Sequence, residues 1–352
     1  MALGRRGSIL ASAALLAACG GDGLGAGPDG GADAAADGGA DTDTETEAVC
    51  GAGSPAALAA CVDGARYETD LLAFSIERPQ WSAGWEELQA ACAARLEALG
   101  FDVAFEEYGS GVNVVGRLEG AAEPETEVVV SAHYDHVEGC PGADDNASGV
   151  AGALEAARVL AEAHFGRTLV VACWDEEEEG KVGSEAFVAA AVAAGTAIEV
   201  AVVFEMIGYA TDEPGSQEFP DGFELAFLEQ LAEVAENDYR GDFLAIVAGE
   251  DAHAVVAAAE HHTEMAGVPA IALELPMDWL SSDMIADLRR SDHDAFWQAG
   301  YPALMLTDTA DFRYAAYHCM DGDDVPENLD TGFATAIIRG AVAASAEALG
   351  LE

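Results

Sequence analysis

Residues 128–149 read VVVSAHYDHVEGCPGADDNASG, and this stretch decides the fold. Its three consecutive valines predict a short buried strand that ends at Ser131-Ala132-His133. The segment 150–163 repeats its apolar residues at helical spacing, and the β-rich run 168–173 predicts a second strand. A strand, a helix and a strand in this order are typical of an α/β domain whose strands are parallel.

The same alternation continues on both sides of that stretch. We expect helices at 85–99, from 183 onward, at 223–235 and at 327–349, and strands at 101–105, 112–118, 200–204, 270–273 and 303–306. The fold class is therefore α/β, with three layers and a mixed, mostly parallel central sheet flanked by helices. Ligands bind at the carboxyl ends of strands in such sheets, and potential metal ligands follow three expected strands at 133, 175–178 and 205.

The composition excludes several classes of protein. The chain has 352 residues, with 65 Asp and Glu against 14 Lys and Arg, for a net charge of −51. Such a surface repels phosphate backbones, so we expect no nucleic-acid partner, and it offers no basic patch for anionic lipid. Hydrophobic residues make up 51% of the chain, which is too many for a disordered protein. No apolar run of about 18 residues follows the N-terminus, which excludes a polytopic membrane protein.

The first 18 residues have the layout of a bacterial lipoprotein signal peptide. Arg5 and Arg6 precede the apolar residues 9–16, and Leu-Ala-Ala-Cys follows at 16–19. This resembles a lipobox, in which Cys19 is lipidated, and the alternative is an ordinary signal peptide with a chance cysteine. We therefore expect an exported chain, anchored to a bacterial membrane only through a lipid on Cys19 and facing the periplasm or the cell exterior.

Three further segments follow the leader. Residues 19–48 are dominated by Gly, Ala, Asp and Thr and contain no Lys or Arg, which predicts a flexible acidic tether. Residues 49–79 are expected to form an N-terminal extension, and residues 80–352 the main domain. If Cys19 carries a lipid, six cysteines remain, and an even number permits disulfides in an exported protein. Cys50 and Cys61 are the predicted pair, whereas Cys92 and Cys173 lie in apolar runs and are expected to be buried thiols.

Five short segments carry imidazole and carboxylate groups in a fixed order. They are His133-Tyr134-Asp135, the run 142–149, Glu176 to Gly180 followed by Gly183-Ser184, Phe204 to Gly208, and Tyr317-His318. Such mixtures suit Zn²⁺, and two metal ions can share a carboxylate. Together the segments resemble the co-catalytic di-zinc aminopeptidases, a family of secreted, leucyl-aminopeptidase-like bacterial exopeptidases with a hydrolase-like three-layer fold. The resemblance covers roughly residues 80–350 and includes Ser291-Asp292-His293.

The resemblance implies a role for each of these site residues. Two Zn²⁺ ions would share Asp145, one held also by Glu178 and His318 and the other also by His133 and Glu205. Glu177 corresponds to the general base, Asp135 to the acid that orients a ligand imidazole, and Tyr317 to the hydroxyl near the oxyanion. The peptide bond after Asp145 is cis in the family. Many relatives have Asp where Glu205 stands.

The implied activity is hydrolysis of N-terminal residues from peptides with a free N-terminus, by a monomer. A glutaminyl cyclase-like or carboxypeptidase member of the same clan is the alternative within enzymes, and Arg289-Arg290 is the candidate pair for a substrate carboxylate. A catalytically inactive binding lipoprotein is the alternative outside enzymes. The remaining histidines are expected to be structural, exposed or supporting: His136, His164, His253, His261, His262 and His293.

Overall fold

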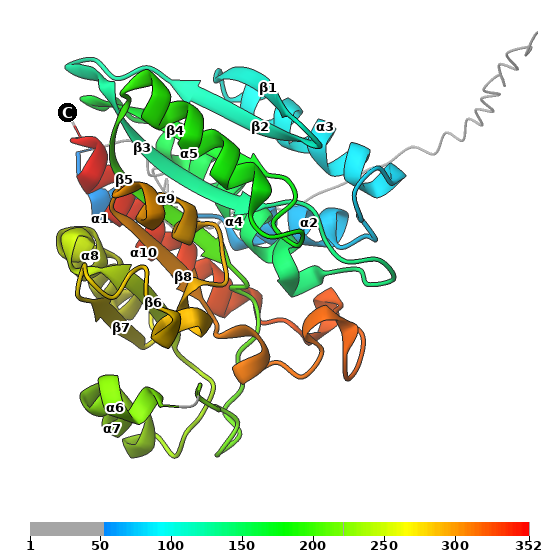
Figure 1. Ribbon diagram of the computed structural model, residues 1–352, viewed down its shortest axis with the longest axis vertical. Helices are drawn as coiled ribbons and strands as arrows, with labels where there is room; N and C mark the ends of the chain where they lie inside the picture. Colours follow the sequence, from blue (N-terminus) through cyan, green and yellow to red (C-terminus); the bar gives the residue numbers. More distant parts are fainter. Residues whose placement is uncertain (1–52, 221, 352) are drawn as a thin grey trace, which may run out of the picture. The chain divides into compact units, whose positions relative to one another are not determined.

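The computed structural model describes residues 53–220 and 222–351, whose helices and strands are shown in Figure 1. The predicted signal peptide, the predicted tether and Cys50 lie outside the described residues. The strands are β1 (Asp102–Tyr108), β2 (Gly111–Leu118), β3 (Glu123–His133), β4 (Arg167–Trp174), β5 (Ala197–Glu205), β6 (Leu244–Gly249), β7 (Ala270–Leu275) and β8 (Ala303–Thr307). The helices are α1 (Pro55–Ala59), α2 (Gly64–Phe74), α3 (Ala83–Ala98), α4 (Gly149–Leu160), α5 (Val182–Ala194), α6 (Phe223–Ala226), α7 (Leu228–Glu236), α8 (His253–Met265), α9 (His293–Ala299) and α10 (Thr331–Leu349).

These strands form one eight-stranded sheet in the order β1-β2-β4-β3-β5-β8-β6-β7. The central strands β4, β3, β5 and β8 are parallel to their neighbours in this group. Antiparallel pairing occurs between β1 and β2, between β2 and β4, and between β6 and β8. The predicted mixed, mostly parallel sheet is confirmed, and its parallel centre brings the carboxyl ends of β3, β4, β5 and β8 to one edge.

Helices cover both faces of the sheet because successive strand residues point to opposite sides. Val128 and Val130 are buried with residues of α2, α3, α4, α8 and α10, whereas Val129 is buried with residues of α5, α7 and α9. Burying these apolar residues on both faces supplies the main driving force for folding. The predicted three-layer architecture follows directly from this arrangement (Figure 1).

Local sequence signals set several helix boundaries. Ser82 caps the start of α3 by accepting a hydrogen bond from the backbone N–H of Trp85 at 3.1 Å, and the chain leaves the helix through Gly100 at φ +89°. Asp330 caps α10 in the same way. Among the helices that the structure describes, α10 alone is long and apolar enough to cross a membrane, yet most of its residues are buried inside the domain.

Three features differ from or add to the predicted elements. The single helix expected at 223–235 is split into α6 and α7 at Phe227, whose φ of −127° is not helical. Strand β6 and helix α8 were not predicted from the sequence. The predicted extension at 49–79 contributes α1 and α2, and Leu58, Tyr67 and Leu71 lie in the same hydrophobic core as α4 and α10.

Candidate active site

Three of the predicted metal ligands lie at or directly after the ends of parallel strands. β3 ends at His133, β5 ends at Glu205, and Glu178 follows β4 by four residues. Because β4, β3 and β5 are neighbours in the sheet, these side chains lie at the same edge. The Oε2 atom of Glu205 lies 3.3 Å from Nε2 of His133.

The predicted bridging residue Asp145 comes from a loop rather than from a strand. It lies in the segment Ala143–Ser148 that precedes α4, where its own dihedral angles (φ −99°, ψ 94°) are not helical, and the expected cis peptide bond joins it to Asn146. Its Oδ1 atom is 3.4 Å from Nε2 of His133, and its Oδ2 atom is 3.1 Å from Nε2 of His318. The two carboxylate oxygens therefore face two different imidazoles.

These residues form two groups that share Asp145. His133 and Glu205 complete the first group. Glu178 and His318, whose Nε2 lies 3.1 Å from Oε2 of Glu178, complete the second, and the His136 imidazole also lies close to Asp145 and Glu178. The Nε2 atoms of His133 and His318 are buried and have no hydrogen-bond partner within the described residues, and the same holds for Nε2 of His136. Unpartnered imidazole nitrogens among converging carboxylates are the donor set that zinc prefers, and the carboxylate charge needs a cation to balance it. The residues present therefore fit zinc.

Asp135 connects the first histidine to the acidic run after β4. Its carboxylate oxygens accept hydrogen bonds from the backbone N–H groups of Glu177 at 3.1 Å and Glu178 at 3.2 Å. Its Oδ1 atom lies 3.5 Å from Nδ1 of His133, and Nδ1 also contacts the backbone oxygen of Asp135 at 3.3 Å. The buried Asp135 side chain thus contacts a ligand imidazole and holds the backbone of two adjacent glutamates in place.

The four consecutive glutamates have different surroundings. Glu176 is buried, and its carboxylate accepts hydrogen bonds from Ser110 Oγ at 2.7 Å and from the Gln80 amide. Glu179 is exposed. Burial raises the pKa of Glu177 well above its ordinary value against the opposing effect of His133, and Glu205 adds to the rise. A carboxyl group with a raised pKa is suited to accept and return a proton.

Tyr317 lies beside the second histidine and at the mouth of an apolar pocket. Its ring stacks on that of His318 with centroids 3.9 Å apart, and the Arg290 guanidinium carbon lies 5.4 Å from the Tyr317 ring centroid. Glu205 and Tyr317 line this pocket together with residues of β6, β7 and β8. Its apolar lining includes Phe219, Phe223, Phe243, Ile271, Leu273 and Met305.

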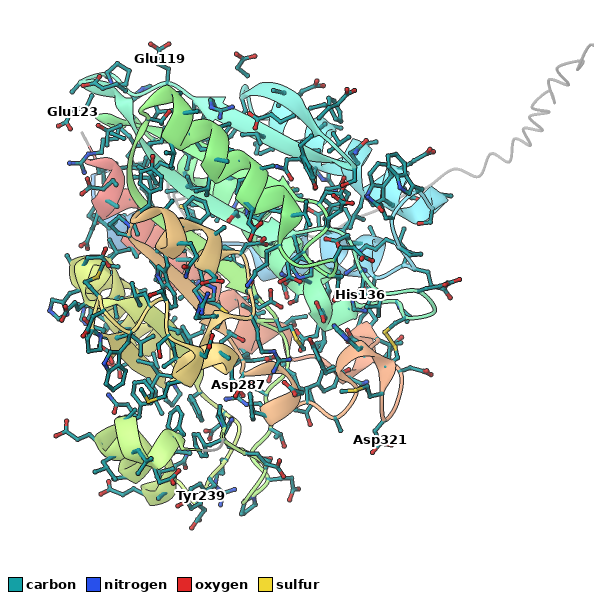
Figure 2. The ribbon with its side chains drawn as sticks, viewed as in Figure 1. Glu119, Glu123, His136, Tyr239, Asp287 and Asp321 are labelled. Carbon is teal, nitrogen blue, oxygen red and sulfur yellow. A yellow bond between two sulfur atoms is a disulfide. The ribbon has the colours of Figure 1, made fainter. Side chains whose placement is uncertain are left out.

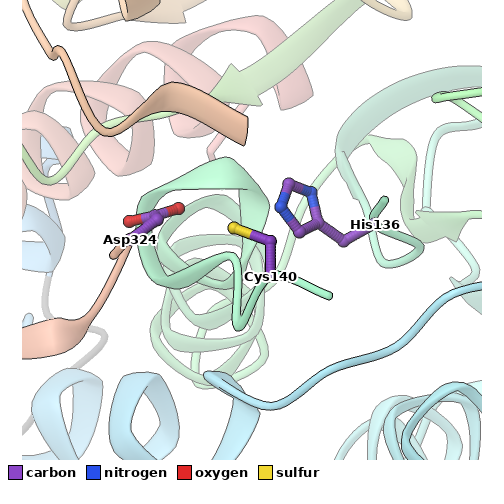
Figure 3. Close-up of side chains that lie close together, drawn as sticks. All are labelled: His136, Cys140 and Asp324. Carbon is purple, nitrogen blue, oxygen red and sulfur yellow. The ribbon is translucent and has the colours of Figure 1, made fainter. Parts of the chain in front are cut away.

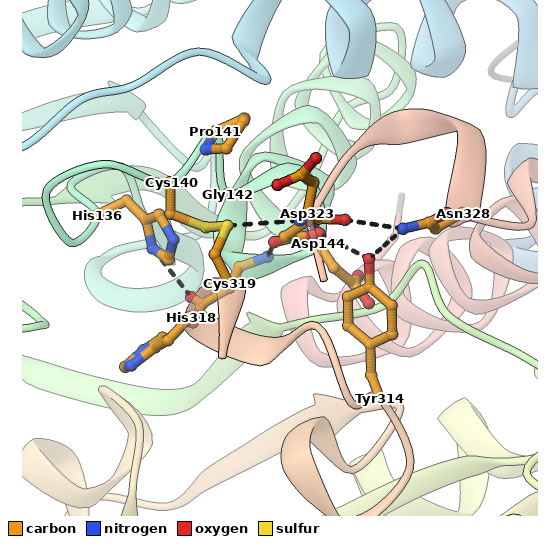
Figure 4. The surroundings of a disulfide bond; sticks show 12 residues. His136, Cys140, Pro141, Gly142, Asp144, Tyr314, His318, Cys319, Asp323 and Asn328 are labelled. Carbon is orange, nitrogen blue, oxygen red and sulfur yellow. Dashed lines mark hydrogen bonds and ion pairs between the residues drawn. A yellow bond between two sulfur atoms is a disulfide. The ribbon is translucent and has the colours of Figure 1, made fainter. Parts of the chain in front are cut away.

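A disulfide that the sequence left open ties together two loops of the site. Cys140, in the loop after β3, is bonded to Cys319, the neighbour of His318 (Figure 4). Cys140 also lies close to His136 and Asp324 (Figure 3), but its sulfur is used in the disulfide, so these three residues are not a further metal site. Cys92 and Cys173 are buried free thiols, as predicted. Cys61 is disulfide-bonded, and its pairing with Cys50 stays a prediction.

Two residues that sequence reasoning missed hold the loop 140–148, which carries Asp145 and which we call the bridging loop. Arg78 is fully buried and donates hydrogen bonds to the backbone oxygens of Gly142 at 2.8 Å and Asp145 at 2.9 Å. Asp324 accepts hydrogen bonds from the backbone N–H groups of Asp144 at 2.9 Å and Asp145 at 3.1 Å. The only signal in the sequence was that Arg78 is one of 14 basic residues in so acidic a chain.

Comparison with known proteins gives matches to one peptidase family. The model of peptidase family M28 matches residues 113–243, a range that contains His133, Asp145, Glu178 and Glu205 but not His318. Uncharacterized protein YfbL of Escherichia coli (strain K12) is 31% identical over 207 residues, which are 56% of this chain and 59% of that protein. A probable zinc metalloprotease of Pyrenophora teres f. teres (strain 0-1) is 29% identical over 206 residues, 56% of this chain and 41% of that protein. The chain thus spans about half the length of the curated relatives it matches.

Solved structures share the fold. The LapA aminopeptidase of Legionella pneumophila superposes with a TM-score of 0.63 at 18% identity, covering 85% of this chain and 75% of that chain. A glutaminyl cyclase of Fimbriiglobus ruber superposes with a TM-score of 0.55 at 16% identity, covering 81% of this chain and 95% of that chain. The resemblance drawn from the sequence is confirmed over residues 113–243, which match the model of peptidase family M28.

Proposed function

We propose that the chain is a di-zinc aminopeptidase that removes N-terminal residues from peptides with a free amino group. The observation that carries the proposal is the position of Asp145, whose two oxygens face Nε2 of His133 and Nε2 of His318. Each histidine is accompanied by a further carboxylate, from Glu205 or Glu178. This arrangement supports two metal ions that share one carboxylate, and both would be zinc.

The residues of the chain then divide the chemical work. Zinc bound at this site would lower the pKa of a water molecule and polarise the scissile carbonyl. Glu177, whose pKa is raised by burial, takes the proton of the attacking water and returns it to the leaving amine. Tyr317 donates its hydroxyl hydrogen bond to the oxyanion as it develops. Asp135 keeps Glu177 and Glu178 in register through their backbone N–H groups.

Two features support cleavage at the N-terminal residue. The carboxylates of Glu205 and Glu177 attract the ammonium group of a peptide N-terminus and so place the first peptide bond at the metals. The pocket that opens beside Glu205 and Tyr317 has a mostly apolar lining and suits the side chain of that first residue. A blocked N-terminus would lose the first of these interactions.

A glutaminyl cyclase-like activity is the second candidate, and it is supported by the glutaminyl cyclase among the structural neighbours. A carboxypeptidase receives less support, because both predicted arginines already have carboxylate partners. Arg289 Nε lies 2.8 Å from Asp294, and Arg290 Nη1 lies 2.8 Å from Asp311. Neither guanidinium is left as an unpaired charge for a substrate carboxylate.

Metal analysis combined with three substrates tests the proposal. We expect two zinc ions per chain, rapid release from a fluorogenic aminoacyl amide, and no release from its N-acetylated form. If fully active protein holds one zinc ion and converts a glutaminyl peptide to a pyroglutamyl product, the aminopeptidase proposal is wrong and the protein is a glutaminyl cyclase. Two zinc ions without hydrolysis of any substrate would indicate a binding protein.

We further propose that the protein is exported and carries a lipid on Cys19, which rests on the Leu-Ala-Ala-Cys motif behind a charged and apolar leader. The protein should partition into the detergent phase, and Cys19→Ser should abolish that partition. Wild-type protein that stays in the aqueous phase would contradict the lipid anchor, whatever the outcome of the activity assays.

A further inference from the structure

His136 is a buried imidazole beside the metal ligands, and nothing in the proposed mechanism uses it. It follows Asp135 directly in the loop after β3, and its side chain has no exposed surface. Its Nδ1 atom lies 2.8 Å from Oε1 of Glu178. Its ring meets that of His318 edge-on, with centroids 5.6 Å apart. Figure 2 marks its place in the molecule.

The surrounding chain fixes the position of this ring. The backbone N–H of His136 donates to the backbone oxygen of Arg78 at 3.3 Å. A Cβ atom at Gly142 would come within 2.5 Å of the His136 ring, so the backbone of the bridging loop packs directly against the imidazole. The Cys140–Cys319 disulfide joins the same loop to the segment of His318 (Figure 4). The contact between His136 and Glu178 is therefore built into the fold.

The distances distinguish the roles of the two histidines. His318 Nε2 lies 3.1 Å from one oxygen of Asp145 and 3.1 Å from one oxygen of Glu178, so it stands between the two carboxylates. His136 Nδ1 is 2.8 Å from Glu178 but 3.9 Å from Asp145. His318 thus lies equally close to both carboxylates, whereas the closest approach of His136 is to Oε1 of Glu178.

Hydrogen-bond chemistry then gives the direction of the His136 contact. An ionised carboxylate can only accept, so Nδ1 of His136 carries the hydrogen and donates it to Oε1. With Oε1 engaged, Glu178 has Oε2 free, and this is the oxygen that faces His318. Carboxylate ligands of metals are commonly held by such outer partners.

We infer that His136 is a positioning residue, which holds Glu178 so that it binds its zinc through Oε2 alone. The inference rests on the metal site of the proposed function. It concerns mainly the zinc ion of Glu178 and His318, because His133 and Glu205 lack a contact to His136 among the described residues, and the shared Asp145 lies 3.9 Å from His136 Nδ1. Loss of the hydrogen bond should therefore weaken one zinc ion and spare the other.

Two variants separate the hydrogen bond from the imidazole itself. His136→Leu fills the space without a donor, whereas His136→Asn keeps an N–H group near the position of Nδ1. Zinc affinity of the holoenzyme, measured by competition with a chromophoric chelator, should fall about 10- to 100-fold at one site in His136→Leu. In His136→Asn both sites should stay within about threefold of the wild type, since the donor to the ligand carboxylate is retained.

His253→Leu is the matched control. The exposed His253 also contacts a glutamate, because its Nδ1 lies 2.9 Å from Oε2 of Glu274, but this pair is not part of the site. It should leave both zinc affinities unchanged. If thermal unfolding of the zinc-free protein shows that His136→Leu is not folded, His136→Gln is used instead. The longer side chain of Gln places its amide N–H beyond the position of Nδ1.

The outcomes separate this inference from the proposed function. Wild-type affinities at both sites in His136→Leu would overturn the inference alone. Equal losses in His136→Asn and His136→Leu would also overturn it, by showing that the imidazole is itself a ligand. A wild-type chain that binds no zinc would remove the proposed function and the inference together.

Discussion

The two halves of the site are held by different parts of the molecule. His133 and Glu205 end neighbouring strands, so the hydrogen bonds of the sheet fix their backbones. Asp145 and His318 come from loops, which are held by the Arg78 guanidinium, the Asp324 carboxylate and the Cys140–Cys319 disulfide. The strand half, which is His133 and Glu205, is a consequence of the fold. The loop half, which is Asp145 and His318, depends on a few side chains. A substitution that loosens one half should therefore spare the other.

Asp145→Asn should have the largest effect, because this residue of the loop half also faces His133 of the strand half. The amide keeps the shape of the side chain but loses the charge that two cations would share. We expect both zinc ions to be lost and activity to disappear, as measured by elemental analysis and the fluorogenic assay. Asp321→Asn, at an exposed aspartate, is the control and should change neither. Retention of a full zinc pair in Asp145→Asn would refute the bridging role.

Glu177→Gln should have the next largest effect, on the reaction alone. The amide cannot accept a proton, so the rate should fall by about 10²- to 10⁴-fold. Zinc content should remain near normal, because Glu178 supplies the ligand. Glu179→Gln is the matched control at an exposed position of the same run and should be silent. A loss of zinc in Glu177→Gln would instead show that the register of the four glutamates has been misassigned by one residue.

The difference between the two halves also decides what the sequence could predict. Strand ends are local features of the sequence. An apolar run such as Val128 to Val130 predicts a strand, and the polar residue that follows predicts its end. The bridging loop and its neighbours were found only through the resemblance to a family. Contacts across long separations gave no such signal, and the Cys140–Cys319 bond joins residues 179 positions apart.

Arg78 and β6 show the same limit in other ways. Arg78 acts on backbone oxygens, which every residue possesses, so its partners carry no sequence signature. Strand β6 is a short apolar run, and such a run is compatible with a buried helix as well as with a strand. It lies antiparallel to β8 and parallel to β7, and this place is decided by pairing with strands distant in sequence.

Removing the disulfide should disturb the loop half only. Cys140→Ser combined with Cys319→Ser opens a bond that closes a long segment, and the free energy of unfolding should fall by about 2–5 kcal/mol in denaturant titrations. The zinc ion held by His318 should be lost at lower chelator concentration, since Cys319 adjoins His318. Cys92→Ser provides a comparison at a buried free thiol. Equal weakening of both zinc ions would contradict the separation of the halves.

Glu205→Asp should have the smallest effect and concerns the strand half. It introduces the aspartate that the family resemblance implies at this position, and it withdraws the carboxylate by one methylene group. Glu205 Oε2 now lies 3.3 Å from His133 Nε2 and accepts a hydrogen bond from Ser291 Oγ at 2.6 Å. The shorter side chain cannot keep both contacts unless the backbone moves, and the end of β5 is held by its pairing with β8.

We therefore expect the zinc ion beside His133 to bind about 10-fold more weakly, the lower end of the range for a disturbed ligand environment. The zinc ion beside His318 should keep its affinity, and Ser291→Ala, which removes the Ser291 contact without shortening the ligand, should give a smaller loss in the same chelator competition. Unchanged affinity in Glu205→Asp would show that this edge of the sheet adapts to the shorter side chain, and that the strand half is less rigid than its hydrogen bonds imply.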